Sequence, residues 1–244
     1  MDTIIKASLG IFVVVLVLFS GLTMYTGYTE AAYRDTLAGT YSYTCWITTD
    51  GPLYNVTLFI PVPVDVTGNS PMVSEFSSNT MKGVPAAWDT TLFDTGKSTL
   101  IRIMTPGILP PEGTAAPCLY TVIFSSETTA RTPIDTRNPV EKSVVFRPVQ
   151  ALNETICKTG LAGDSARCFT YATSVYADYR TTKDTTVSIN AAITGRNTWT
   201  VFEPYFNEFH SDISITMKGE QQGWAVLEGE LTSGTGTFDV PAGS

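Results

Sequence analysis

Residues 90–100, TTLFDTGKSTL, place a carboxylate, an amine and several hydroxyl groups around one glycine. Gly96-Lys97-Ser98 could end a phosphate-binding loop, in which backbone N–H groups and the lysine hold the phosphates of a nucleotide. Such a loop needs a glycine five positions before Gly96, where Thr91 stands, and a helix after the serine. The β-branched run STLIRIM follows instead, so we do not expect a nucleotide site here.

Phe93-Asp94-Thr95-Gly96 in the same stretch resembles the active-site turn of the pepsin-like aspartic proteases. Their chemistry needs two carboxylates that share one proton, so that one acts as base and the other as acid. The chain has no second Asp-Thr/Ser-Gly, and only a homodimer of the retroviral-protease kind could supply the partner. We expect a β-turn between two strands, in which Asp94 bonds local backbone groups.

His210 is the one histidine in the chain, so any scheme with histidine as acid or base must use it. Glu208, His210 and Asp212 alternate, and on a strand they would share a face that could hold a divalent cation or relay a proton. We expect solvated side chains near a strand edge. We predict no catalytic residue, no metal ligand and no cofactor.

The tryptophans raise the question of a carbohydrate-binding face, because flat rings stack on sugars. Sandwich cores also use tryptophan, and faces cannot be assigned without the strand register. We expect at least two of the four to lie in the core. They are Trp46, Trp88, Trp199 and Trp224.

The charge balance argues against nucleic acid as a partner. The net charge is −8, charged residues make up only 16% of the chain, and no run of lysine and arginine supplies a local basic patch.

Residues 7–29 contain no charged side chain, and about twenty apolar residues span a ~30 Å hydrocarbon core as a helix. We predict a transmembrane helix there, with residues 1–6 in the cytoplasm. Lys6 lies on the inner flank, offset by Asp2, whereas Glu30 begins the outer flank, so the charges favour an extracytoplasmic C-terminal domain. The expected location is the cell membrane, crossed once.

Three interpretations of this segment stay open. An uncleaved signal anchor is the one we favour, and a cleaved secretory signal would need a better processing site than Thr29-Glu30-Ala31-Ala32. The layout also resembles archaeal type IV pilins, in which a short leader is removed and the apolar helix packs in a filament core. Lys6-Ala7 departs from the basic-Gly pair of that family.

All four cysteines follow the helix, which predicts two disulfides in an oxidising compartment. Cys157 and Cys168 enclose the glycine-containing stretch KTGLAGDSAR, so we pair them and, by elimination, Cys45 with Cys118. The spacings between the cysteines do not match a zinc site.

Asn55-Val56-Thr57 and Asn153-Glu154-Thr155 are sequons, which predict N-glycosylation at Asn55 and Asn153.

Runs rich in β-branched and aromatic residues alternate with turn residues over residues 38–233, which is typical of an antiparallel β-sandwich. TYSYTCWITT and YNVTLFIPVPVD flank Asp50-Gly51-Pro52, so we expect a hairpin over residues 40–66. The polar stretch 126–142 is the one candidate for a boundary between two β units. Residues 234–244 are expected to form a loose tail.

The region YRDTLAGTYSYTCWITTDGPLYNVTLFIPVPVD, residues 33–65, resembles uncharacterised single-span surface proteins of methanogenic archaea. The resemblance implies the same topology and assigns no activity. We therefore predict an all-β, antiparallel β-sandwich domain outside the membrane behind one N-terminal helix, with a structural or binding role at the cell surface.

The expected partners are the lipid bilayer, further copies of the chain or other surface proteins, and carbohydrate. A pilin-like filament subunit is the first alternative. An extracytoplasmic hydrolase that uses Asp94 is the second.

Overall fold

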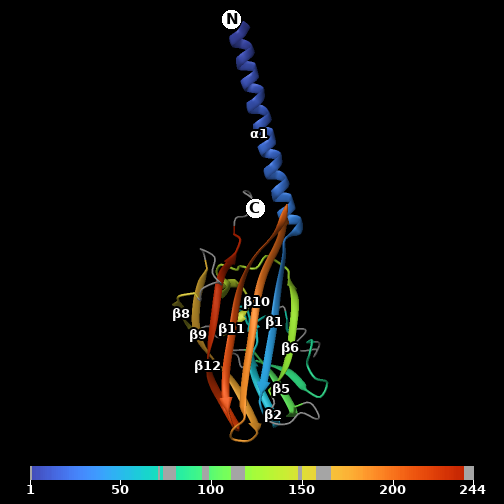
Figure 1. Ribbon diagram of the computed structural model, residues 1–244, viewed down its shortest axis with the longest axis vertical. Coiled ribbons are helices and arrows are strands. Elements are labelled where there is room, and N and C mark those ends of the chain that lie inside the picture. The colour runs from blue at the N-terminus through green and yellow to red at the C-terminus, as the bar shows by residue number, and fades with distance from the viewer. Residues whose placement is uncertain are drawn as a thin grey trace.

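The computed structural model describes residues 2–70, 72–73, 81–94, 99–110, 119–147, 150–157 and 166–238. It consists of one long N-terminal helix and a β domain attached to the C-terminal end of that helix (Figure 1). The predicted all-β, antiparallel domain behind a single helix is confirmed.

Helix α1 (Asp2–Thr36) extends beyond the predicted span of residues 7–29 at both ends. The stretch from Ile5 to Thr36 is long and apolar enough to cross a membrane, and none of its most apolar window is buried in the domain. Only Leu37 separates the helix from the first strand, so the chain passes from helix to sheet without a flexible linker.

In the described residues, twelve strands follow the helix, together with the four-residue helix α3 (Pro139–Lys142). Their bounds are β1 (Ala38–Thr49), β2 (Leu53–Pro61), β3 (Pro63–Val64), β4 (Asp89–Asp94), β5 (Thr99–Ile108), β6 (Tyr120–Ala130), β7 (Val145–Phe146), β8 (Gln150–Thr155), β9 (Arg167–Arg180), β10 (Thr186–Val201), β11 (Glu203–Lys218) and β12 (Gln221–Gly236).

Ten of these strands form one antiparallel sheet in the order β4-β5-β2-β9-β12-β11-β10-β1-β6, with β8 paired to part of β9. The sheet curls until its two edges approach each other. Lys82, shortly before β4, forms a bridge with Ser125 on the opposite edge strand β6, and Trp88 packs edge-on against Phe124. The layers expected of a sandwich therefore belong to one curled sheet, and β3 and β7 form a separate two-stranded sheet.

The core lies inside this curl because the strands alternate buried and exposed side chains. Strand β1 shows the alternation along nearly its whole length, with Tyr43, Cys45 and Ile47 fully buried. Phe146 from β7 packs edge-on against Tyr43 from within the curl. One continuous cluster of buried residues joins eight strands of the large sheet, and the partly buried Leu92 on β4 and Leu152 on β8 pack against it.

The hairpin predicted over residues 40–66 is wrong. β1 pairs with β10 and β6, whereas β2 pairs with β5 and β9, so Asp50-Gly51-Pro52 carries the chain from one half of the curled sheet to the other. The backbone N–H of Thr186 donates to the Asp50 carboxylate over 2.7 Å, and the Thr181 hydroxyl donates to the Pro52 carbonyl. The Asp-Gly segment is thus fixed by the β9–β10 crossover beside it.

The candidate boundary at residues 126–142 does not separate two sheets. Residues 126–130 are the end of β6, and strands before and after the stretch share one sheet. The buried Asn197 side chain on β10 bonds both the N–H and the C=O of Ile134, which ties the stretch to the sheet. The loose tail was expected to begin at residue 234, but β12 continues to Gly236. Residues 239–244 lie outside the described part.

Two glycines make room for large aromatic rings in neighbouring strands. Gly195 is directly opposite Phe209, and Gly229 is opposite Tyr171. A Cβ atom added at Gly195 would lie 2.2 Å from the Phe209 ring, and one at Gly229 would lie 2.3 Å from the Tyr171 ring. The two rings therefore occupy the space that side chains at these positions would need.

Gly195→Ala should lower the free energy of unfolding by about 2 kcal/mol, because overpacking displaces the fully buried Phe209 ring. Chemical denaturation of the full chain measures the loss. The double variant Gly195→Ala/Phe209→Leu should lose less unfolding free energy than the sum of the losses in the two single variants. The smaller leucine side chain leaves room for the methyl group of the alanine. Strict additivity would contradict the proposed contact.

Candidate functional site

Asp94 lies at the end of β4, where the structure confirms two antiparallel strands joined by a short connection. Asp94 is opposite Thr99, the first residue of β5. Because a strand follows Ser98, the helix that a phosphate-binding loop requires is absent from this position. The connection itself, residues 95–98, lies outside the described residues.

Glu208, His210 and Asp212 lie on β11 and share its outer face, as their spacing predicts. The His210 Nε2 atom is 3.3 Å from a carboxylate oxygen of Asp212, and Nδ1 is 3.1 Å from the Thr194 hydroxyl on β10. Glu208 lies 3.7 Å from the guanidinium of Arg196. Each ring nitrogen of His210 thus has a local partner.

An open groove of about 670 Å³ passes over these residues on the half of the domain nearer the helix. β12 contributes Glu228 and Glu230 to it, and Asp212 is directly opposite Glu230. The groove is acidic because Glu208 and Asp212 also line it, and the carboxylates that are directly opposite each other repel. Among the described residues, no group of three or more histidine, cysteine, aspartate or glutamate side chains is arranged to hold a metal ion.

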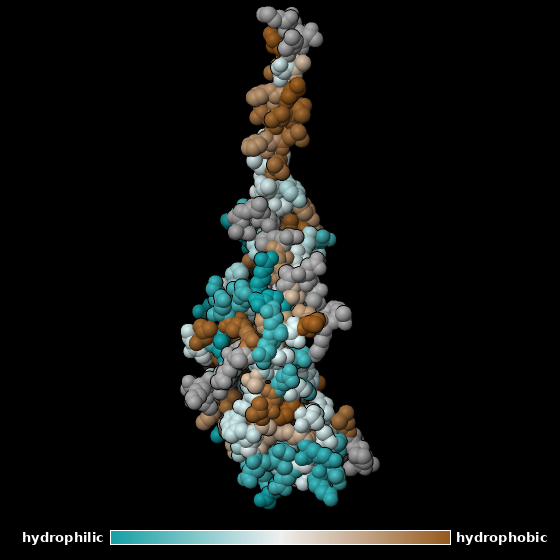
Figure 2. All heavy atoms as spheres, turned by 90° about the vertical axis from the view of Figure 1, so that its left-hand side faces the viewer, coloured by the Kyte–Doolittle hydropathy of each residue, from teal (hydrophilic) through white to brown (hydrophobic). Residues whose placement is uncertain are grey.

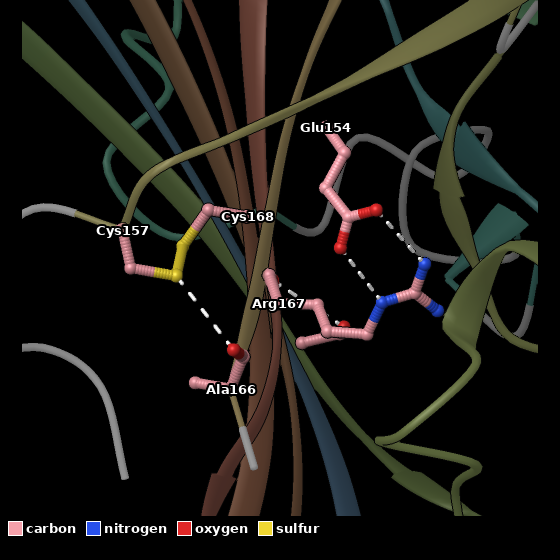
Figure 3. A network of polar contacts seen from close by, with 6 residues as sticks. Glu154, Cys157, Ala166, Arg167 and Cys168 are labelled. Atoms are coloured by element: carbon pink, nitrogen blue, oxygen red, sulfur yellow. Dashed lines mark hydrogen bonds and ion pairs between the residues drawn. A yellow bond between two sulfur atoms is a disulfide. The ribbon is translucent and has the colours of Figure 1, made fainter. Parts of the chain in front are cut away.

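The disulfide between Cys157 and Cys168 is confirmed and lies at the rim of this groove (Figure 3). Beside it, Arg167 on β9 forms an ion pair with Glu154 on β8, with 3.1 Å between Nε and the carboxylate. The hydrogen bond from Arg167 lowers the pKa of Glu154. The disulfide and the ion pair together hold β8 against the first residues of β9.

The predicted disulfide between Cys45 and Cys118 is not formed, because Cys45 is a free, buried cysteine. Its side chain points into the core from the middle of β1, opposite Phe124. Tyr120, the first residue of β6, is opposite Thr49, roughly 13 Å along the strand from Cys45. Cys118 lies outside the described residues.

A row of aromatic side chains, which could not be predicted from the sequence, crosses the outer face of the curled sheet in the half that lies away from α1. Trp224 on β12 is opposite Tyr176 on β9, which is opposite Phe59 on β2. The ring centroids lie 5.5 Å apart between Trp224 and Tyr176, and 5.4 Å apart between Tyr176 and Phe59. Phe93 on β4 packs against Phe59 at the same distance and ends the row.

This row lies in a partly exposed, mainly apolar patch, which we call the distal patch: Phe59, Phe93, Met104, Tyr176, Trp224 and Val226. Arg102 on β5 lies directly opposite Phe59 and is the charged residue beside it. Val226 is 77% exposed and Trp224 is 57% exposed. Figure 2 shows hydrophobic residues gathered low on the domain, far from the helix and bordered by hydrophilic ones. An apolar patch with a polar rim is typical of an interaction surface.

The tryptophans divide as expected between core and surface. Trp88 and Trp199 are buried, which confirms that at least two of the four lie in the core, whereas Trp224 is exposed in the distal patch.

Both predicted glycosylation sites are accessible, since Asn55 and Asn153 are exposed on β2 and β8. Glycosylation itself stays a prediction.

Comparisons with models of known protein families, with curated proteins and with solved structures found no match to this chain.

The Cys45 thiol should resist alkylation in the folded protein, because it is fully buried and burial raises its pKa far above the usual range. Mass spectrometry after treatment with iodoacetamide, without reductant, should find Cys45 modified only when the chain is unfolded. Cys157 and Cys168 should stay unmodified until a reductant is added, which provides the internal control. A Cys45 that needs reductant even after unfolding would contradict the free thiol.

Proposed function

We propose that this protein is a membrane-anchored surface component whose β domain has a binding role outside the membrane. The observation that carries this proposal is the bare apolar helix. Its most apolar window has a mean hydropathy of 2.4 and is not buried by any part of the domain. Such a helix is stable in hydrocarbon, where its backbone groups are paired internally and its side chains need no cover.

The proposed orientation places the β domain on the extracytoplasmic side. The disulfide between Cys157 and Cys168 supports it, because disulfides persist in oxidising compartments. Lys6 before the apolar stretch and Glu30 after it agree with the same orientation. The resemblance of residues 33–65 to archaeal surface proteins remains part of this proposal.

The distal patch is the proposed binding surface, and its geometry favours a protein partner over a sugar. The Tyr176 ring is tilted by 66° from Trp224 and by 83° from Phe59, so the rings do not form one flat platform for stacking on a sugar. Val226 and Met104 add aliphatic area beside them. Large aromatic and sulfur-containing side chains are enriched at protein interfaces.

Membrane anchoring and orientation can be tested on the full chain in cells. The protein should stay with the membrane after extraction at alkaline pH. A cysteine introduced by Lys183→Cys, in the exposed turn far from the helix, should react with an impermeant maleimide on intact cells. A cysteine introduced by Asp2→Cys should react only after permeabilisation.

Either of two results would overturn this proposal. Release of a soluble chain that lacks the apolar helix would indicate a secreted protein. Recovery in sheared surface filaments, after loss of a few N-terminal residues, would indicate the pilin-like alternative.

The distal patch can be tested by photo-crosslinking on intact cells. Benzoylphenylalanine at Val226 should give a discrete protein adduct, whereas the same group at Thr129, exposed on the outer face of β6, should not. Trp224→Ala should reduce the adduct several-fold, because it removes the largest exposed ring of the patch. An adduct that forms equally from both positions, or none, would contradict a protein-binding patch.

A further inference from the structure

The tip of the β10–β11 hairpin carries an exposed phenylalanine beside the helix. Phe202 is the single residue between the two strands and is 69% exposed. Its ring stacks on Tyr25 with 6.0 Å between centroids and lies 5.4 Å from Tyr28. Figure 1 shows β10 and β11 rising to meet α1 at this point.

The backbone at the tip is unfavourable for such a side chain. Phe202 has φ of 64°, and Asn55 is the only other non-glycine residue with positive φ among the described residues. A bulky residue with positive φ is an outlier, because its Cβ crowds the backbone. Glycine would suit this conformation better, so local structure alone does not account for phenylalanine at position 202.

Contacts below the tip fix its position relative to the helix. The Thr36 hydroxyl donates to the Thr200 carbonyl over 3.2 Å and accepts from the Thr200 N–H over 2.9 Å. Tyr33 packs edge-on against the buried Trp199, with 5.6 Å between ring centroids. The hairpin therefore cannot move along the helix without breaking these contacts.

The helix sets the depth at which the Phe202 ring lies. About twenty helical residues span the hydrocarbon core, so a span that starts at Ala7 ends near residue 27. Tyr25 and Tyr28 lie on either side of that level, and the first charged residue, Glu30, follows one turn later. Aromatic rings concentrate at this boundary between acyl chains and headgroups.

We propose that Phe202 inserts into the headgroup–acyl boundary of the same bilayer that α1 spans. This inference rests on the proposed membrane anchoring. The Phe202 ring reaches the level of the helix tyrosines, while the neighbouring Glu203 accepts a hydrogen bond from Tyr205, further down β11, over 2.8 Å. The tip thus presents a ring to the boundary and keeps its carboxylate on the headgroup side.

The insertion gives the domain a second attachment point beside the helix. One helix alone would let the domain rotate about the membrane normal and tilt. A ring held at the boundary by the hairpin restricts the tilt, so the end of the β domain that carries the β10–β11 tip faces the bilayer surface.

The test uses the full chain in lipid nanodiscs and tryptophan fluorescence at position 202. Phe202→Trp is compared with the parent chain in discs of phosphatidylcholine and in discs of phosphatidylcholine with acyl chains brominated near the headgroup. The added emission of Phe202→Trp should lose most of its intensity in the brominated discs. Phe93→Trp, at an exposed phenylalanine in the distal patch, is the matched control and should show no loss.

The outcomes separate this inference from the proposal on which it rests. A chain that enters the discs but whose tryptophan at position 202 is not quenched overturns the insertion and leaves the anchoring intact. A chain that does not enter the discs overturns both. Phe202→Gly should keep the melting temperature of the parent chain or raise it, and a large loss would show that the ring serves the fold instead.

Discussion

The fold depends on one constraint: a sheet with an apolar inner face must cover that face itself. The four-residue helix α3 is too short to cover a ten-stranded sheet. Closing the sheet into a curl buries the inner side chains of each half against those of the other. The contacts between Trp88 and Phe124 and between Lys82 and Ser125 lie where the two edges approach.

Features that depend on neighbouring residues could be predicted from the sequence. The apolar run at the N-terminus predicts the helix, and the alternation of apolar and polar residues predicts the strands. The short spacing of Cys157 and Cys168 predicts the disulfide. Which strands pair could not be predicted in this way, because closure of the sheet decides it. Asp50-Gly51 looks like a hairpin turn, but β1 and β2 belong to different halves of the curl.

The same distinction applies to the candidate sites. Glu208, His210 and Asp212 share a face because they alternate on one strand, and this could be predicted. The aromatic row could not be predicted, because Phe59, Tyr176 and Trp224 come from strands far apart in the sequence. Their register brings them together only when the sheet is complete. Elimination pairs Cys45 with Cys118, but the buried position of Cys45 in mid-strand cannot be seen without knowing which strands lie beside it.

The direct passage from α1 through Leu37 into β1 determines how the domain would respond to a pulling force. A load applied between α1 and the distal patch enters the sheet along β1, which is bonded on one side to β10 and on the other to β6. The force is parallel to the strand and perpendicular to its hydrogen bonds, so the bonds share the load in shear instead of opening one after another. The strand that continues α1 is therefore placed to resist mechanical extension.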